Sequence, residues 1–223
     1  MIAGVDGCRG GWIAATQTGG VTSLKVLESL DILFRDETLV VAVIDMPIGL
    51  PERGSRPCDL LARKLLGKAR GSSVFPAPIQ AMLAARDHKE ASDLRYGVEA
   101  KRCSIQLAAI LPKIRELNNL MTPELQLRAR EGHPEVSFAV MNADRPMSHP
   151  KRLQAGRAER TALLDRSFPD VTARLAEVGS FAGDAVDAYA MLWTAQRIAA
   201  GTARVLGRNT DVDTRGIRME IVA

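Results

Sequence analysis

The N-terminal 27 residues contain one short apolar run and two further strand candidates, joined by glycine-rich connections, and this pattern constrains the fold more than any other part of the chain. The segments are Ile2–Val5, Trp12–Thr18 and Val21–Leu27, with Gly10-Gly11 and Gly19-Gly20 between them. Short apolar runs separated by glycine turns are typical of consecutive antiparallel strands. The sequence therefore predicts a three-stranded β-meander at the start of the chain.

A fourth strand is predicted at Leu39–Ile44, where every residue is apolar. A run without polar alternation suits a central strand that is covered on both faces. Asp45 follows directly, and Pro47 and Pro51 come soon after it. Because proline cannot continue a central strand, we expect this strand to end at Asp45.

Helical patterns fill most of the remaining chain, and two further strands are expected among them. The predicted helices are Glu28–Arg35, Cys58–Leu66, Ile79–Ala85, Lys89–Tyr96, Ile105–Leu117, Pro123–Glu131, Pro150–Ser167, Pro169–Glu177 and Gly183–Ala200. Pro112 is expected to kink or break its helix. The fifth strand is placed at Val136–Met141, and Ile217–Val222 is expected to form an edge strand. These elements predict a single α/β domain over residues 1–223, with a helical insertion at about residues 50–132 between strands four and five.

Length and composition exclude two classes of protein. The 223 residues are 46% hydrophobic and 25% charged, which is ordinary for a folded domain and unlike a disordered chain. No apolar run approaches the length of a transmembrane helix, so a membrane is not expected as a partner. The 30 Lys and Arg residues exceed the 26 Asp and Glu residues, giving a net charge of +4. This excess permits an anionic partner without requiring one.

The cysteines and the N-terminus point to a reducing compartment. Cys8, Cys58 and Cys103 are widely spaced and form no CxxC motif, which speaks against a disulfide framework and a structural zinc site. The first residues lack the basic region and apolar stretch of a secretory signal. We therefore expect a cytoplasmic protein.

Acidic residues at strand ends and on the last helix suggest a site for chemistry. Asp6 follows the first strand and Asp45 the fourth, so the two carboxylates meet at one sheet edge if these strands are neighbours. Asp184 and Asp187 are three residues apart and share a helix face. Glu135 begins the predicted fifth strand.

Carboxylates that converge in this way repel one another unless cations neutralise them. Mg²⁺ or Mn²⁺ would be the natural partner, and two such ions about 4 Å apart can promote phosphodiester cleavage. Each acid also has a plainer explanation. Asp6 and Asp45 could be turn formers, Asp184 could cap its helix, and Asp187 could be a favourable charge in the first helical turn.

Seven blocks of the chain resemble, in the same order, the prokaryotic family called domain of unknown function 429. They are Gly4–Trp12, Ile44–Pro51, Arg56–Asp59, Ser73–Phe75, Pro112–Ile114, His133–Glu135 and Gly183–Ala188. The family is regarded as predicted nucleases with a ribonuclease-H-like fold. The resemblance thus implies a five-stranded mixed sheet, flanked by helices, whose first three strands are antiparallel.

The resemblance also implies a metal site like that of the Holliday-junction resolvase, built from Asp6, Asp45, Asp184 and Asp187. In that site, a first-strand Asp, a fourth-strand acid and two acids of the last helix bind metal. Glu135 would be a further ligand or a base. The family often has Ser-Lys-Lys after the fifth strand, whereas residues 148–152 here include a proline. An anion-binding role for the basic residues of that segment is therefore not carried over.

The leading hypothesis is a Mg²⁺- or Mn²⁺-dependent nuclease with nucleic acid as its substrate. Candidate phosphate contacts are Arg9, Arg53, Arg56, Lys113 and Arg115, each of which could equally be a solvated surface residue. Aromatic residues are scarce at 4%, so a stacking platform for single strands is weakly supported. The apolar helical insertion could serve a homodimer interface.

Two other functions remain open at this point. An actin-like phosphotransferase would turn the segment from Asp6 to Gly11 around the phosphates of a nucleotide, with Asp6 holding Mg²⁺. Such proteins duplicate the domain, however, and 223 residues hold one copy. A non-catalytic binding protein that keeps the fold and an acidic cluster is the other alternative.

Overall fold

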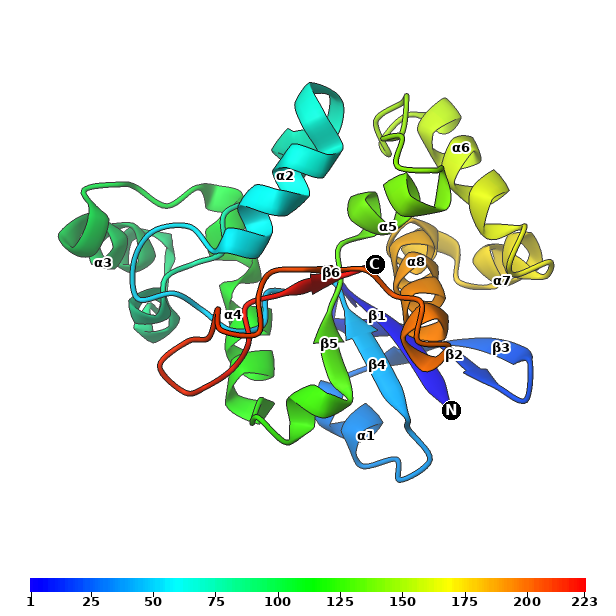
Figure 1. The fold of residues 1–223 in the computed structure, drawn as a ribbon, viewed down its shortest axis with the longest axis horizontal. Coiled ribbons are helices and arrows are strands. Elements are labelled where there is room, and N and C mark those ends of the chain that lie inside the picture. The colour runs from blue at the N-terminus through cyan, green and yellow to red at the C-terminus, as the bar shows by residue number, and fades with distance from the viewer.

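The computed structural model describes residues 1–223 and contains a five-stranded mixed sheet with the order β3-β2-β1-β4-β5 (Figure 1). The strands are β1 (Ile2–Cys8), β2 (Gly11–Thr18), β3 (Val21–Leu27), β4 (Val41–Ile44) and β5 (Ala129–Glu131). Strand β2 runs antiparallel to both β1 and β3, whereas β4 runs parallel to β1 and β5 runs parallel to β4. The predicted α/β class and mixed sheet are confirmed, and they are consistent with a ribonuclease-H-like fold.

The pairing of β1 with β4 brings two acidic residues to one edge of the sheet. Val5 and Ile44 are register partners in the parallel ladder, so Asp6 and Asp45 occupy the next position on neighbouring strands. The amide of Asp45 donates to the carbonyl of Val5 at 2.9 Å, which extends the ladder by one bond. The predicted meeting of these two residues is confirmed.

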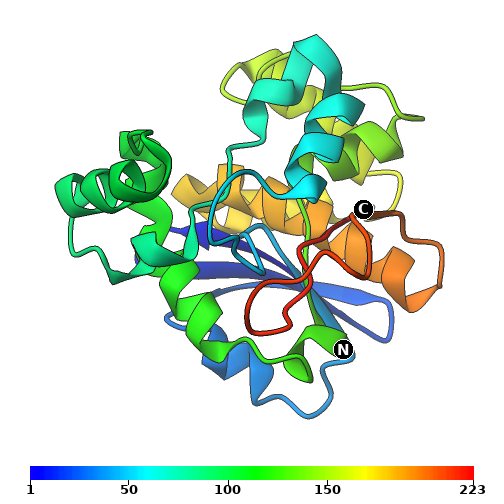
Figure 2. The same ribbon diagram turned by 60° about the vertical axis from the view of Figure 1, so that its left-hand side comes forward.

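Helix α8 (Ala182–Ala199) covers one face of the sheet, and α1 (Leu30–Phe34) and α4 (Ile105–Leu120) cover the other (Figure 2). The contact between α8 and β1 is unusually close, because a Cβ atom on Gly4 would lie 1.9 Å from the backbone nitrogen of Leu192. Only glycine allows the helix backbone to approach the strand so closely. This approach places the first turns of α8 beside the end of β1.

A helical insertion separates β4 from β5, as predicted. It contains α2 (Pro57–Arg70), η1 (Gly71–Ser73), η2 (Gln80–Ala84), α3 (His88–Glu99), α4 and η3 (Leu125–Leu127). Pro112 was predicted to kink or break its helix, and since α4 continues through it, it does not break the helix. Leu111 and Ile114 are buried on either side of the proline, and their burial offsets the lost backbone hydrogen bond.

The predicted fifth strand is wrong in position. Residues 136–141 belong to α5 (Pro134–Met141), and the strand that pairs with β4 is Ala129–Glu131, where a helix was expected. Pro134 occupies the first helical turn, where its missing N–H costs nothing. Because α5 is buried over most of its length, its largely apolar sequence shows no helical periodicity.

The rest of the chain completes the helical layer. It contains α6 (Gln154–Leu164), α7 (Val171–Glu177), η4 (Gly179–Phe181) and a two-stranded sheet of β6 (Val205–Leu206) and β7 (Ile221–Val222). The expected C-terminal edge strand is thus confirmed in shorter form and pairs outside the main sheet. None of the helices combines the length and apolar character needed to cross a membrane.

Candidate metal centre

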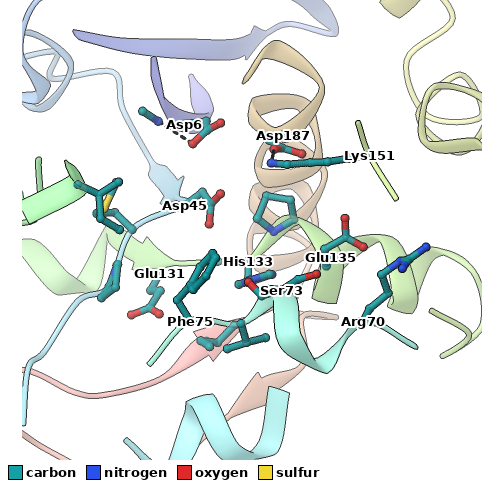
Figure 3. A pocket seen from close by; sticks show the side chains of 18 of the residues that line it. Asp6, Asp45, Arg70, Ser73, Phe75, Glu131, His133, Glu135, Lys151 and Asp187 are labelled. Carbon is teal, nitrogen blue, oxygen red and sulfur yellow. Dashed lines mark hydrogen bonds and ion pairs between the residues drawn. The ribbon is translucent and has the colours of Figure 1, made fainter. Parts of the chain in front are cut away.

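Three aspartates from three elements converge at the edge of the sheet (Figure 3). Asp6 lies in β1, Asp45 directly follows β4, and Asp187 lies in the second turn of α8. One carboxylate oxygen of each lies within 4.8 Å of those of the other two. We call these residues the acidic triad. Asp187 is only 2% exposed and Asp6 only 9%, so water screens their mutual repulsion poorly.

Burial and mutual repulsion favour the protonated forms of two members of the triad, Asp6 and Asp45. The pKa of Asp6 lies well above its ordinary value, first because the group is buried and then because Asp45 and Asp187 are close. Burial and the charge of Asp187 raise the pKa of Asp45 to about 7. Clustered hard oxygen ligands with raised pKa values suit a divalent cation, which would replace the protons and remove the repulsion. The triad could therefore hold a divalent metal ion.

Lys151 supplies a positive charge within the same site. Its Nζ atom donates to Oδ2 of Asp187 at 2.6 Å, and the negative charge of Asp187 raises the pKa of Lys151. The segment before it is held by Glu159, whose carboxylate accepts the amides of Ser148 at 2.8 Å and His149 at 3.1 Å. The loop that carries Lys151 is therefore held in place by hydrogen bonds, although the Lys151 side chain is 64% exposed.

The sequence pattern predicted Glu135 at the start of a strand. In the structure Glu135 lies in the first turn of α5 instead. Its Oε1 atom accepts from Nε of Arg160 at 3.1 Å and from Nη2 at 2.5 Å, and both side chains are buried. Its Oε2 atom is buried without a hydrogen-bond partner. Glu135 lines the same pocket as the acidic triad but is not one of the three convergent acids.

Asp184 lies one turn before Asp187 on α8 and is partly exposed. Burial and the neighbouring charge of Asp187 raise its pKa. Its carboxylate does not belong to the set of oxygens that converge within 4.8 Å. The structure thus brings together three of the four aspartates that the resemblance implied and leaves Asp184 at the side of the triad.

The basic residues named as phosphate contacts occupy different environments. Arg9 and Arg53 are exposed and do not line the pocket. Arg115 donates to the carbonyls of Leu83 and Ala85, so its guanidinium is used in contacts within the helical insertion. Lys113 lines the pocket, donates to the carbonyl of Gly11 and lies 4.8 Å from the ring centroid of Trp12. Of these four, Lys113 is the one that the structure brings to the triad.

Arg56 is buried beneath the site and is 2% exposed. Its guanidinium donates to Asp59 at 2.6 Å, to Glu131 at 2.6 and 2.7 Å, and to the carbonyl of Ile48 at 3.1 Å. With its Nε atom also bonded to Asp59, no nitrogen remains free for a phosphate. Glu131 in turn accepts the amide of Ile48 at 2.6 Å, so this network fixes the segment that follows Asp45.

The sequence reasoning missed Glu131 and Arg160 as parts of the site, and it did not carry over an anion-binding role for Lys151 because of Pro150. Glu131 ends a parallel strand as Asp45 does, so the same strand-end rule would have found it had β5 been placed correctly. The buried role of Arg160 leaves no comparable signal, because arginine is common on exposed helix faces.

Most of the chain matches one known protein family. Residues 4–211 match the family described as "Protein of unknown function (DUF429)". The chain belongs to the DUF429 family. No curated protein and no solved structure matches it. The matched range includes the whole acidic triad, Lys151 and Glu135, so the DUF429 region carries the complete candidate site.

Proposed function

We propose that this DUF429 protein is a Mg²⁺- or Mn²⁺-dependent phosphodiesterase that hydrolyses nucleic acid at the acidic triad. The observation that carries the proposal is the convergence of Asp6, Asp45 and Asp187 within 4.8 Å in a largely buried setting. Folding such a group costs free energy unless a cation compensates it. An acidic cluster that lowers the stability of the fold and lines a pocket is more typical of a functional site than of residues that only pack the core.

The roles of the chain's own residues follow from their positions. Asp6, Asp45 and Asp187 would hold the ion, which when bound would activate water and stabilise negative charge on a phosphoryl oxygen. Lys151 keeps Asp187 oriented through its 2.6 Å bond and places an ammonium where charge develops during cleavage. The buried pair of Arg56 and Glu131 keeps the Asp45 segment in place.

Nucleic acid is the favoured substrate because basic side chains that are free of the buried Arg56 and Arg160 ion pairs line the pocket beside its acidic centre. Arg70, Lys113, Lys151 and Arg152 all line it. Basic side chains around a carboxylate cluster would bind the phosphates on either side of the bond to be cleaved. The overall charge of +4 is compatible with such an anionic substrate.

The test is cleavage of single- and double-stranded DNA and RNA with Mg²⁺, Mn²⁺ or EDTA. We expect cleavage with a metal and none with EDTA. Asp45→Asn and Asp187→Asn should each reduce the rate by at least about a hundredfold. Asp165→Asn is the matched control, because Asp165 is exposed on the surface after α6.

Two results would contradict the proposal. One is that no substrate is cleaved under any metal condition by protein that is folded and binds Mn²⁺, which would favour a non-catalytic binding protein. The other is that Asp45→Asn and Asp187→Asn both cleave as fast as Asp165→Asn.

A further inference from the structure

The pocket that contains the acidic triad is larger than a metal site needs. Its volume is about 690 Å³, which is within the range of pockets that hold small organic ligands. Residues 70–75, which join α2 to the following loop, form a second wall. Figure 3 shows Arg70 and Asp6 at opposite ends of the pocket. A ligand group at Arg70 would therefore be separate from the group at the triad.

Unpartnered polar atoms concentrate in this pocket, and two of them belong to Arg70 on the second wall. Buried side-chain atoms without a hydrogen-bond partner are Arg70 Nε, Arg70 Nη2, Gln80 Oε1, His133 Nδ1, Glu135 Oε2 and Arg197 Nε. Four of these six atoms belong to residues that line this one pocket. Unsatisfied buried polar atoms are rare in native proteins and call for a partner. Their concentration here indicates that a bound ligand supplies the missing partners.

Arg70 presents the side of its guanidinium that binds phosphate best. Its Nη1 atom donates to the carbonyl of Ala69 at 3.0 Å, whereas Nε and Nη2 have no partner. These two nitrogens form one edge of the planar group, and that edge can donate two parallel bonds to two oxygens of an anion. No carboxylate lies within ion-pair distance of it, although Glu135 lines the same pocket.

The wall that carries Arg70 is held in a defined shape. Gly67 has φ 56°, a left-handed conformation that favours glycine and redirects the last residues of α2. Arg63 donates through Nε and Nη2 to the carbonyl of Val74 at 2.9 and 2.7 Å. Nε2 of His133 lies 3.3 Å from the carbonyl of Ser73. A ligand would therefore meet a prepared surface and would not have to order a loop.

The same wall offers an aromatic ring. Phe75 is 56% exposed and lines the pocket. Phe75 and Arg70 line the same pocket, with Ser73 and His133 between them in Figure 3. An exposed aromatic ring and an unpartnered arginine in one pocket offer partners for a base and for a phosphate. Few aromatic residues are available elsewhere, since they make up 4% of the chain.

We infer that the Arg70 wall is a subsite for one nucleotide of the substrate strand, with a phosphate that is not cleaved bound at the Nε–Nη2 edge of Arg70 and the base on Phe75. This inference deepens the proposed nuclease function and rests on it for the identity of the strand. The subsite recognises a nucleoside monophosphate unit, and it sets the position of the scissile bond relative to the triad.

The experiment measures binding without cleavage or metal. Isothermal titration with adenosine 5′-monophosphate, adenosine and inorganic phosphate is carried out in EDTA on the full chain. We expect the monophosphate to bind more tightly than adenosine or phosphate alone. Arg70→Gln should weaken it about ten- to a hundredfold, and Phe75→Ala should weaken it about tenfold.

Matched variants separate recognition from general effects. Arg157→Gln removes an exposed arginine of α6 that does not line the pocket, and it should bind the monophosphate as the wild type does. Phe75→Leu keeps an apolar side chain but should lose the same affinity as Phe75→Ala. Circular dichroism and the urea midpoint report whether each variant is folded.

Several results would overturn the inference. They are unchanged affinity in a folded Arg70→Gln variant, an equal loss in Arg157→Gln, or inorganic phosphate that binds as tightly as the monophosphate. Because the titration needs neither the triad nor a metal, failure here leaves the nuclease proposal standing. Equally, monophosphate binding by a protein that cleaves nothing would refute the nuclease proposal but not the subsite.

Discussion

Arg56 and Glu131 form a two-point ion pair beneath the acidic triad, with Nη1 2.7 Å from Oε2 and Nη2 2.6 Å from Oε1. Both side chains are almost completely buried, at 2% and 4% exposure. The pair joins the start of α2 to the end of β5, and Glu131 also accepts the amide of Ile48. It therefore ties the helical insertion to the loop that follows Asp45.

Breaking this pair from one side is expected to destabilise the fold. Arg56→Gln would leave Glu131 and Asp59 buried without their common counter-charge. Removal of one partner of a buried ion pair costs about 3–5 kcal/mol. Urea denaturation should show the loss as a lower midpoint with an unchanged slope.

An exposed ion pair between an arginine and a glutamate provides the control for Arg56. Arg86 bonds to Glu90 on the surface, with 87% of the Arg86 side chain exposed, so Arg86→Gln should leave the urea midpoint almost unchanged. Equal midpoints for Arg56→Gln and Arg86→Gln would show that the buried pair contributes no net stability.

The bond between Lys151 and Asp187 predicts an effect on metal affinity. The ammonium shares an oxygen-rich site with the incoming ion and repels it. Lys151→Met should therefore bind Mn²⁺ about three- to tenfold more tightly than the wild type in a titration at pH 8. Lys64→Met, on the exposed face of α2, should not change the affinity. Weaker Mn²⁺ binding by Lys151→Met would mean that the lysine supports the metal site instead of competing with it.

Asp184 and Asp187 should differ in their importance for the metal. Asp187 belongs to the convergent triad and Asp184 does not, although a purely sequence-based reading treats them alike. Asp187→Asn should weaken Mn²⁺ binding by at least about tenfold, whereas Asp184→Asn should stay within about threefold of the wild type. Titration of both variants checks this order, and a reversed order would require α8 to rotate when metal binds.

The parts of the site that depend on local sequence patterns could be predicted from the sequence. Asp6 and Asp45 each come at or directly after an apolar strand, and the parallel pairing of β1 with β4 brings such positions together. The helix with Asp187 was predictable from its alanine-rich face, which packs against the sheet.

Other parts depend on contacts between distant residues and could not be predicted in this way. Lys151 reaches the triad because Glu159 and Arg160 hold its loop, and no local pattern encodes that path. The strand predicted at Val136–Met141 is wrong because this segment is buried on nearly all sides, which removes the polar periodicity that distinguishes a helix from a strand.

The raised pKa of Asp45 predicts how stability depends on pH without metal. In the unfolded chain this carboxyl ionises near pH 4, whereas in the fold burial and Asp187 raise its pKa to about 7. The folded state thus binds more protons between these values, and the contribution of Asp45 to stability falls as pH rises from about 4 to 7. Asp45→Asn removes this loss. In EDTA at pH 8 the variant should be more stable than the wild type by on the order of 2–4 kcal/mol, and near pH 4 the difference should vanish. Urea denaturation across this range measures it, and a difference that stays constant with pH would show that Asp45 titrates as an ordinary carboxyl group.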